Sequence, residues 1–343
     1  MSPPTSFYQP YADLHKDPQG EGDARPTAMK IIEDQGLINK WSDKVVLITG
    51  TNVGIGTETA RALHATGAKV FVTARTKAKV EPVVTDILST SPSKVPIEII
   101  EMDLSSLSSI RKAASDFLSR TSQLNVLVNN AGIMACPQSK TSDGFELQLG
   151  TNHLGHFLFF QLLAPTLVQS STPSFASRVI NVSSSGHGMA APDFDNLHFQ
   201  KPNSYSPFAA YGASKTANIW FSNEIERRYA QEGLHSISLH PGVIFQTGLT
   251  RNLAPGAMDG LDVSKWEKLI KSVQQGAATQ VWAATAKELE GQGGFYVADC
   301  GVSKPIAEGE EVGGSTYAPH AYNEEGERKL WEVSCEAVGV GKV

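Results

Sequence analysis

A nearly constant interval separates the first four strand-like segments of this chain. Each is a short run rich in Val, Ile or Leu, and the runs end near residues 50, 75, 103 and 130, at intervals of 25, 28 and 27 residues. Helical patterns lie between them, as in residues 107–117, where Ser105 or Ser106 is a suitable N-cap. Similar runs follow at residues 178–182 and 236–239. Apolar strands that alternate with helices predict a doubly wound, mostly parallel α/β sheet with helices on both faces.

The first strand-like run leads into a glycine-rich turn and then a helix. Gly50, Gly54 and Gly56 allow the backbone to turn tightly and approach a pyrophosphate, and Asn52 and Ile55 lie in the same turn. The N–H groups at the start of the helix would hold the negative charge. Right-handed crossovers bring this turn to the sheet edge where such folds bind ligands. The turn therefore predicts a dinucleotide site, with an ordinary strand-to-helix connection as the alternative.

The end of the second run indicates which dinucleotide binds. An acidic residue here would bind the ribose hydroxyls of NAD, but the first acid after the run is Glu81. Arg75 instead offers a planar, permanently charged fork for a 2′-phosphate, and Lys77 or Lys79 would add charge. We therefore predict NADP(H) as the preferred cofactor, with NAD(H) as the alternative. Residues after the third and fourth runs complete the predicted cofactor site: Asp103, Leu104, Asn130, Ala131 and Gly132.

A tyrosine and a lysine four residues apart, Tyr211 and Lys215, share one face of a predicted helix. A free phenol titrates near pH ~10 and is a poor base at neutral pH, so an ammonium that stabilises the phenolate would lower its pKa. Ser183 and Ser184 end the fifth run and place a hydroxyl over the same sheet edge. That hydroxyl would hydrogen-bond a carbonyl oxygen and orient it. The pattern predicts proton transfer to or from an oxygen.

Composition and charge exclude several classes of protein. Lys and Arg number 29 and Asp and Glu 35, and the net charge of −6 argues against nucleic-acid binding. Three dispersed cysteines form neither a disulfide framework nor a CxxC zinc pair, and the histidines lack ligand spacing. We therefore predict no metal site and a reducing, cytoplasmic location. No run is long and apolar enough to span a membrane, and the first 30 residues have no apolar core typical of a signal peptide.

These motifs together resemble those of the short-chain dehydrogenase/reductase superfamily. The resemblance covers residues 44–300 and rests on the segments 49–56, 129–132 and 241–242, together with Asn152, Ser184, Tyr211 and Lys215. The chain is similar in particular to the retinol-dehydrogenase and WW-domain-oxidoreductase-like branch, including its fungal members, through residues 151–157, 240–242, 294–300 and 330–335. The resemblance implies a single Rossmann domain with a seven-stranded sheet.

The resemblance also implies a role for each catalytic residue. Tyr211 would be the general acid/base, and Lys215 would lower its pKa and bind the nicotinamide ribose. Ser184 would polarise the substrate carbonyl, with Ser183 as the alternative. Asn152 would hold a water that links Lys215 to solvent. Hydride would pass directly between the cofactor and the substrate carbon, so no metal is implied.

Two positions depart from the family pattern. Val53, before the second glycine, is not basic, so one common determinant of NADP binding is missing. The threonine after residues 241–242 comes late, at Thr247. The resemblance therefore places Val243 and either Gln246 or Thr247 at the nicotinamide.

The chain divides into three predicted parts. Residues 1–43 form an N-terminal arm that is irregular to about residue 26 and then includes one short helix. Residues 44–300 form the catalytic domain, and residues 301–343 form a C-terminal extension that packs on it. The arrangement leaves open whether the arm docks on the domain.

Two segments after strand ends, about 185–209 and 242–275, are unusually apolar for loops, and we predict that they are substrate lids. Their apolar residues favour a bulky substrate such as a retinoid, a steroid or a polyketide-like compound: Phe194, Phe199, Phe208, Phe245, Leu249, Leu253, Met258 and Trp266.

The predicted function is that of an NADP(H)-dependent oxidoreductase that interconverts a ketone and a secondary alcohol. Secondary-metabolite biosynthesis is one expected setting. Two alternatives stay open: a cofactor-binding regulatory or scaffold protein, and an enzyme whose pocket serves non-redox chemistry. The apolar run 156–168 matches a helix that pairs subunits in the superfamily, so the resemblance implies a homodimer or homotetramer.

Overall fold

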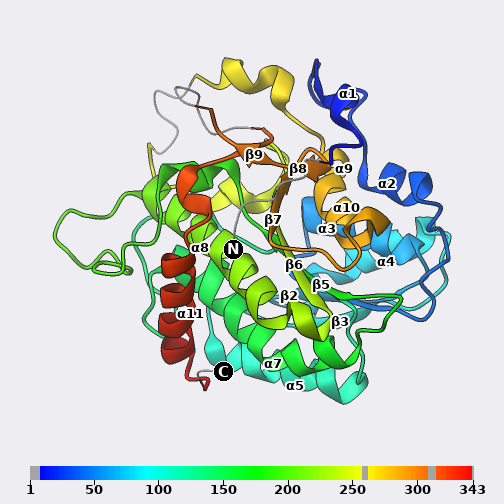
Figure 1. Ribbon diagram of the computed structural model, residues 1–343, viewed down its shortest axis with the longest axis horizontal. Coiled ribbons are helices and arrows are strands. Elements are labelled where there is room, and N and C mark those ends of the chain that lie inside the picture. Colours follow the sequence, from blue (N-terminus) through cyan, green and yellow to red (C-terminus); the bar gives the residue numbers. More distant parts are fainter. Residues whose placement is uncertain (1–7, 257–261, 308–313, 342–343) are drawn as a thin grey trace.

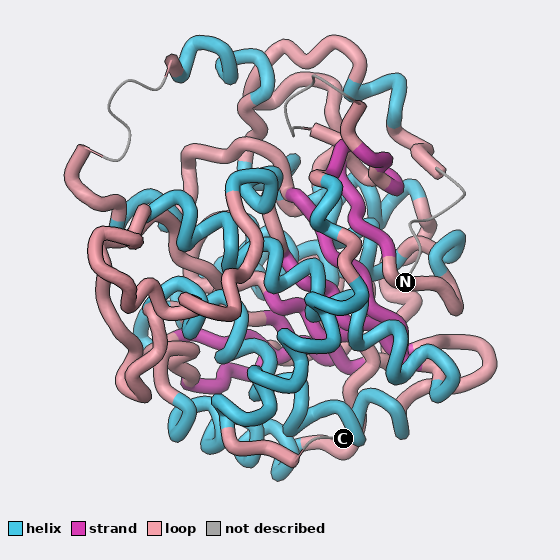
Figure 2. The backbone as a smooth tube through the Cα atoms, turned by 60° about the vertical axis from the view of Figure 1, so that its left-hand side comes forward, coloured by secondary structure: helices cyan, strands magenta, loops and turns pink. Residues whose placement is uncertain are grey.

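The computed structural model describes residues 8–256, 262–307 and 314–341. Met258, which belongs to the second predicted lid, lies outside the described residues. The centre of the protein is a twisted sheet with helices on both faces (Figure 1, Figure 2). Its strands lie in the order β3-β2-β1-β4-β5-β6-β7-β8, with these bounds: β1 Val45–Ile48, β2 Lys69–Ala74, β3 Glu98–Glu101, β4 Val126–Asn129, β5 Ser177–Val182, β6 Leu234–His240, β7 Phe295–Ala298 and β8 Gly301–Val302.

Side-chain alternation along the strands divides the core into two layers. Val46 and Ile48 face one layer, and Val45 and Leu47 face the other. The first layer is covered by α2 Ala28–Asp34, α3 Ile55–Ala65, α4 Glu81–Thr90 and α10 Ala278–Thr285. The second is covered by α5 Leu107–Arg120, α7 Gly155–Gln169, α8 Pro207–Tyr229 and α11 Glu324–Val338 (Figure 1). Both faces of the sheet are buried, which is why the central strand β1 consists only of Val, Leu and Ile residues.

Short elements connect these layers. The remaining helices and strands are α1 Ala12–His15, α6 Leu147–Leu149, α9 Val273–Gly276, β9 Lys304–Pro305 and β10 Thr316–Tyr317. One π-helical turn, η2 Gly150–Leu154, leads into α7. The 3-10 turns are η1 Lys77–Lys79, η3 Ser185–Met189, η4 Ala230–Glu232, η5 Gly248–Asn252, η6 Val263–Leu269, η7 Lys287–Leu289 and η8 Pro319–Ala321.

The sheet is doubly wound and mostly parallel, as the sequence predicts, but it has eight strands instead of seven. The extra strand, β8, is short and runs antiparallel to β7, with Val297 opposite Val302. Asp299 and Cys300 both have positive φ, at 52° and 55°, and turn the chain back between the two strands. The chain reverses around β1, so the turns after β1 and β4 meet at the switch point where such sheets bind ligands.

The N-terminal arm packs against the domain instead of standing apart from it. Thr27 caps α2 by accepting a hydrogen bond from the Lys30 N–H, and Ile31 and Ile32 are fully buried against the sheet layer. Arg25, in the segment predicted to be irregular, is only 4% exposed. Helix α5 likewise begins with a side-chain cap, and Ser106 provides it.

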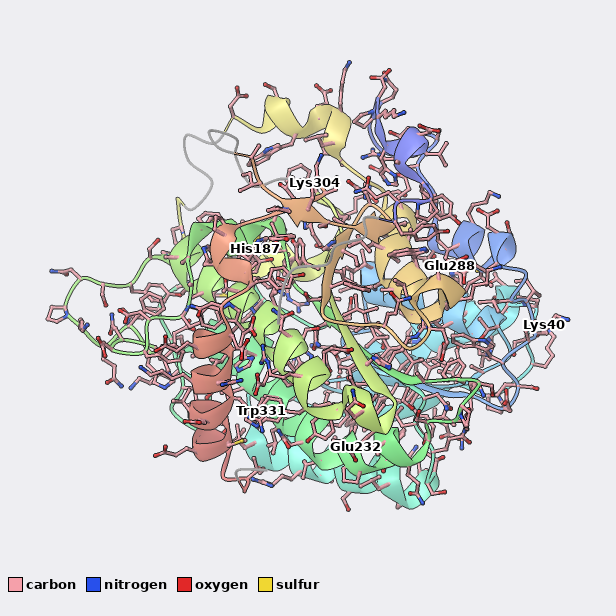
Figure 3. The ribbon with its side chains drawn as sticks, viewed as in Figure 1. Lys40, His187, Glu232, Glu288, Lys304 and Trp331 are labelled. Carbon is pink, nitrogen blue, oxygen red and sulfur yellow. The ribbon has the colours of Figure 1, made fainter. Side chains whose placement is uncertain are left out.

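The C-terminal helix α11 covers the outer faces of α7 and α8. Its Trp331 ring lies 5.0 Å from the Phe157 ring and 6.2 Å from the Phe221 ring (Figure 3). Helix α11 of the same chain thus covers part of the run 156–168, which the resemblance links to subunit pairing, and the homodimer or homotetramer stays a prediction.

The described residues show neither a membrane-spanning helix nor a metal-binding cluster. None of the helices there has both the length and the hydrophobicity needed to cross a bilayer. In the same ranges, no group of three His, Cys, Asp or Glu side chains is arranged to hold a metal ion.

Candidate active site

The glycine turn after β1 has the geometry of a phosphate-binding loop. Gly50 and Gly54 adopt positive φ, at 71° and 72°, which side chains rarely tolerate. A Cβ on Gly56 would lie 2.3 Å from the Gly50 carbonyl oxygen, so the start of α3 touches the turn too closely for any side chain. The N-cap of α3 is Gly54, which provides no side-chain cap in the described structure. The N-terminal N–H groups of α3 therefore suit an anion, and the turn fits a pyrophosphate.

Asn130 ties the turn after β4 to the glycine turn. Its side-chain N–H groups donate to the carbonyl oxygens of Thr49 at 2.8 Å and Gly50 at 3.1 Å. The Thr49 hydroxyl in return accepts from the backbone N–H groups of Asn130 and Ala131, at 2.9 and 3.0 Å. Ala131 also lies close to Gly50, where a Cβ would approach it to 2.7 Å. These hydrogen bonds fix the turn after β4 against the glycine turn.

The predicted adenosine contacts lie at the ends of β2 and β3. Arg75 is exposed just after β2 and has no ion-pair partner within the described ranges, so its fork is free to bind a phosphate. Asp103 follows β3 and accepts from the backbone N–H and hydroxyl of Ser105, at 2.9 and 2.7 Å. Glu101, which sequence reasoning overlooked, accepts from the Lys77 N–H at 2.9 Å and brings a negative charge to the same loop.

Tyr211 and Lys215 lie on the buried face of α8, below the carboxyl end of β5. The Lys215 Nζ donates to the Val182 carbonyl oxygen at 3.1 Å and lies 5.6 Å from the centre of the Tyr211 ring. Burial lowers the pKa of Lys215 to about 8. Burial also raises the pKa of Tyr211 to about 12, although a hydrogen bond from Ser184 opposes the rise. Without a cofactor, desolvation of the phenolate therefore outweighs the Ser184 hydrogen bond, and a lowering of the Tyr211 pKa by Lys215 stays a prediction.

The structure distinguishes the two serines after β5. The Ser183 hydroxyl is buried and donates to the Lys215 carbonyl oxygen at 2.7 Å, so it is occupied by the fold. The Ser184 hydroxyl accepts from the Gly186 N–H at 3.0 Å and hydrogen-bonds the Tyr211 side chain. Ser184 is therefore the serine that faces the tyrosine.

His187 fixes the backbone of Ser184, and the sequence carries no local sign of this. Its Nε2 accepts from the Ala318 N–H at 3.0 Å, so its Nδ1 carries the proton and donates to the Ser184 carbonyl oxygen at 2.6 Å. Burial lowers the pKa of His187 to about 4, which keeps this neutral tautomer at neutral pH. The C-terminal extension thus supports the backbone of Ser184 through His187, which Figure 3 labels.

The Asn152 side chain connects the turn after β4 to α8. It accepts from the Ile133 N–H at 2.9 Å and donates to the Ile133 carbonyl oxygen at 3.0 Å and to Ser214 at 2.9 Å. A Cβ on Gly132 would lie 3.4 Å from both the Asn152 oxygen and the Lys215 Nζ. Asn152 and Lys215 therefore flank the same small space beside Gly132.

His156 has no metal-ligand spacing in the sequence. In the structure it links Asn152 to the glycine turn. Its Nδ1 lies 2.9 Å from the Asn152 carbonyl oxygen, which can only accept, so Nδ1 is the protonated nitrogen. Its Nε2 then accepts from the Thr49 hydroxyl at 2.9 Å. Burial lowers the pKa of His156 to about 4, and the nearby Lys215 charge adds to the shift. Its Thr49 partner is 107 residues away in the sequence, so local patterns could not have revealed this link.

The loop after β6 crosses the mouth of the site. Val243 forms a parallel bridge with Ile270, and Thr247 lies against Gly54, where a Cβ would approach it to 3.2 Å. The Ala254 N–H then donates to the Ala135 carbonyl oxygen at 2.8 Å. The loop thus runs from the end of β6, over the glycine turn, to the turn after β4.

The Gln246 side chain points away from the glycine turn, since it donates to Glu21 of the N-terminal arm at 3.0 Å.

The apolar residues of the first predicted lid serve mainly to pack the protein. The Phe194 ring stacks on Trp220 at 6.2 Å, and Leu197 belongs to the same cluster. A cavity of about 190 Å³ lies beneath this segment, lined by Ala190, Leu197 and Ala213 among others. Met189 is an apolar side chain that lies near Tyr211 and is 50% exposed. A Cβ added to Gly186 would lie 3.0 Å from the terminal methyl of Met189 and 3.0 Å from a ring carbon of Tyr211, so both side chains border Gly186.

The fold and the site define a class of protein. A phosphate-binding turn, a neutral phenol and an ammonium meet at the switch point of a doubly wound sheet, which is the arrangement of an oxidoreductase that binds a nicotinamide dinucleotide. When bound, the nicotinamide would supply or accept the hydride. The protein supplies orientation, charge and the proton.

Comparison with known proteins identifies the family. The family model for short chain dehydrogenases matches residues 44–196. The short-chain dehydrogenase/reductase prx1 of Penicillium roqueforti is 48% identical over 333 residues, which cover 97% of this chain and 96% of that protein. Human retinol dehydrogenase 11 is 39% identical over 302 residues, covering 87% and 86%. This chain belongs to the short-chain dehydrogenase/reductase family, in a retinol-dehydrogenase-like branch with fungal members.

Solved structures agree with this assignment. The Pseudomonas aeruginosa RhlG/NADP active-site complex has a TM-score of 0.59 and 25% sequence identity to this chain, and covers 75% of this chain and 96% of its own.

Proposed function

We propose that this protein is an NADP(H)-dependent reductase that interconverts a bulky, apolar ketone and its secondary alcohol. The observation that carries the proposal is the state of Tyr211: a buried phenol with a pKa near 12, hydrogen-bonded to Ser184, beside the Lys215 ammonium. A phenol that is neutral at pH 7 is ready to give a proton to a carbonyl oxygen. The position of Tyr211 beside Ser184 and Lys215 therefore supports proton exchange with the oxygen of a carbonyl or alcohol.

Each residue has a distinct proposed task. Ser184 donates a hydrogen bond to the substrate oxygen and orients it beside the Tyr211 hydroxyl, which then delivers its proton. Lys215 uses one N–H on the Val182 carbonyl oxygen. Its other two are available to ribose hydroxyls and to a water that restores the proton. Asn152 holds that water, and its side-chain contacts to residue 133 and α8 keep it in place.

The cofactor preference rests on charge at the end of β2. The free Arg75 fork favours a 2′-phosphate, and the NADP complex of a structural relative is consistent with this preference. Glu101 and the uncharged Val53 act against it. We propose that Arg75 outweighs both because it alone offers a bidentate, permanently charged partner.

The remaining cofactor contacts follow from the arrangement of the turns. We propose that the pyrophosphate lies on Asn52, Ile55 and the three turn glycines, and the adenine between Asp103 and Leu104. Val243 and Thr247 contact the nicotinamide end. Thr247 is preferred to Gln246 because the Gln246 side chain is bonded to the arm.

Substrate size and cellular location are also part of the proposal. Met189 and Phe245 are apolar side chains that stay 50% and 37% exposed at the mouth of the site, which favours a bulky, apolar substrate. All three cysteines are buried and none belongs to a disulfide of the described residues, which suits a reducing compartment such as the cytoplasm.

The decisive experiment follows NADPH and NADH oxidation with aromatic, steroidal and small aliphatic carbonyls. We expect the wild type to reduce the bulky ketones, and Tyr211→Phe to bind NADPH but lose turnover. Tyr322→Phe is the matched control, because it removes another buried phenol that donates to the Gly294 carbonyl oxygen. NADPH binding without turnover on any substrate would refute the reductase, and favour a cofactor-binding regulatory protein or a non-redox enzyme.

A charge reversal tests the cofactor preference. Arg75→Asp should weaken NADPH binding by at least tenfold, with little loss for NADH, because a carboxylate repels the 2′-phosphate. Lys94→Asp makes the same change in charge at an exposed position before β3 and should leave both affinities unchanged. An unchanged NADPH affinity in Arg75→Asp would refute the assignment.

A further inference from the structure

The N-terminal arm is bonded to the segment before α9 by a buried arginine. The Arg25 guanidinium donates to the carbonyl oxygens of Leu269 at 2.9 Å, Ile270 at 2.6 Å and Gly20 at 2.9 Å. Its Nε donates to Asp23 at 2.8 Å. Every branch of the guanidinium is therefore used, and its buried charge is compensated. Figure 1 shows the arm beside this segment, at the top of the molecule.

A buried glutamine makes the second connection between the arm and this segment. The Gln275 side-chain oxygen accepts from the Gly22 N–H at 3.0 Å, and its nitrogen donates to Asp23 at 2.9 Å and to the Arg25 carbonyl oxygen at 3.2 Å. Gln275 also completes the cap of α9 with Ser272. The start of α9 is therefore built partly from arm residues.

One contact joins the arm to the end of β7, and another joins it to the loop after β6. The Lys271 Nζ donates to Asp299 at 2.7 Å, and His15 of the arm lies 3.6 Å from the same carboxylate. Glu21 accepts from the Gln246 side chain in the loop after β6.

The segment that the arm holds is also a wall of the cofactor site. Ile270 is bridged to Val243, and the Lys271 N–H donates to the Val243 carbonyl oxygen at 2.8 Å. A Cβ on Gly276 would lie 2.7 Å from Ile244 and 2.9 Å from Ile55 of the glycine turn. Residues 270–276 therefore pack against both the nicotinamide side and the phosphate side of the proposed site.

We propose that Arg25 is a positioning residue for the reaction: through its hydrogen bonds to residues 269 and 270 it sets the position of Val243 and of the loop after β6, so that the N-terminal arm shapes the substrate side of the site. This inference rests on the proposed function. Lysine cannot replace Arg25, since an ammonium cannot reach in a plane to three carbonyl oxygens and a carboxylate.

The test compares Arg25→Lys with Arg178→Lys in the full chain. Arg178 is also buried, bonding the Glu290 carboxylate at 2.7 Å and the Ala283 carbonyl oxygen at 3.3 Å, but β5 places it at the opposite sheet edge. We expect Arg25→Lys to raise the KM for the best ketone about tenfold, with a smaller change in NADPH affinity, and to speed amide exchange of residues 243–249 and 268–276 about tenfold. Arg178→Lys should change neither.

Unchanged KM and unchanged exchange in Arg25→Lys would overturn the inference. If the wild type reduces no carbonyl, the proposed function fails, and the exchange of residues 243–249 with NADPH present decides the inference alone. If Arg25→Lys does not fold, Gln275→Met removes the second connection without leaving a buried charge. It should give the same pattern, and its failure to do so would refute the arm's role.

Discussion

Replacing His156 with phenylalanine should damage catalysis more than stability alone explains. In the wild type the ring donates to the Asn152 carbonyl oxygen and accepts from the Thr49 hydroxyl, both at 2.9 Å. Phenylalanine is similar in size and shape but makes neither bond. The change therefore leaves a buried carbonyl without this donor. It also leaves the Thr49 O–H with only the Val128 carbonyl oxygen as acceptor, 3.5 Å away, while the Thr49 oxygen still accepts from the backbone N–H groups of Asn130 and Ala131.

The magnitude follows from these two broken contacts. A buried polar group left without its partner costs about 1–3 kcal/mol, so His156→Phe should lower the free energy of unfolding by about 2–6 kcal/mol. His153→Phe is the matched control, since His153 is equally buried one turn earlier but makes one hydrogen bond, to Ser334 at 2.8 Å. Its Nδ1 already lacks a partner. That variant should lose about 1–3 kcal/mol.

The assay combines urea unfolding with steady-state carbonyl reduction by NADPH. We expect kcat/KM to fall at least tenfold in His156→Phe, equal to about 1.4 kcal/mol of activation free energy, because Asn152 and the glycine turn lose their common support. His153→Phe should keep wild-type kinetics. His156→Gln retains one donor and one acceptor and should restore part of the rate. Wild-type kcat/KM in a folded His156→Phe would refute the reasoning.

Three further predictions concern pH and packing. The free energy of unfolding should fall as pH drops from about 6.5 toward 4. Four buried histidines have pKa values lowered to about 3 or 4, so near pH 5 the unfolded chain binds about four more protons than the folded one: His153, His156, His187 and His240. A urea midpoint that stays constant from pH 7 to 5 would contradict this. Carbonyl reduction should decline above pH 8 as Lys215, with a pKa of about 8, loses its charge, and a flat rate from pH 7 to 9.5 would exclude that role. Trp331→Ala should cost about 3–5 kcal/mol of unfolding free energy, because the ring packs on Phe157, and an unchanged urea midpoint would contradict this packing role.

Local sequence was sufficient for the elements that depend on local chemistry. The apolar runs that predict β1 to β6 lie within about two residues of the observed strands, because β-branched residues favour strands and residues such as Gly50, Asp103 and Asn130 favour the turns that end them. The glycine turn was equally predictable, since positive φ and a close approach at Gly50 and Gly56 exclude side chains. The sequence did not predict β8, because this strand has only two residues and no periodic pattern.

Contacts between distant residues were beyond local reasoning. Arg25 meets carbonyl oxygens more than 240 residues later in the chain, and His187 depends on the N–H of Ala318. The aromatic content of residues 185–209 suggested a substrate wall, yet Phe194 packs on Trp220. Hydrophobicity in a sequence indicates that a side chain will be buried, but it does not identify what will cover it.

The sequence by itself determined the doubly wound sheet, the phosphate turn and the pairing of a tyrosine with a lysine on one helical face, because strand periodicity, glycine conformation and helical spacing are local properties. Only the tertiary structure decided that Ser184 and not Ser183 faces Tyr211, that the Tyr211 pKa rises, and that the arm and α11 close over the domain. Those outcomes depend on desolvation and on which surfaces meet, and both are set by the whole folded chain.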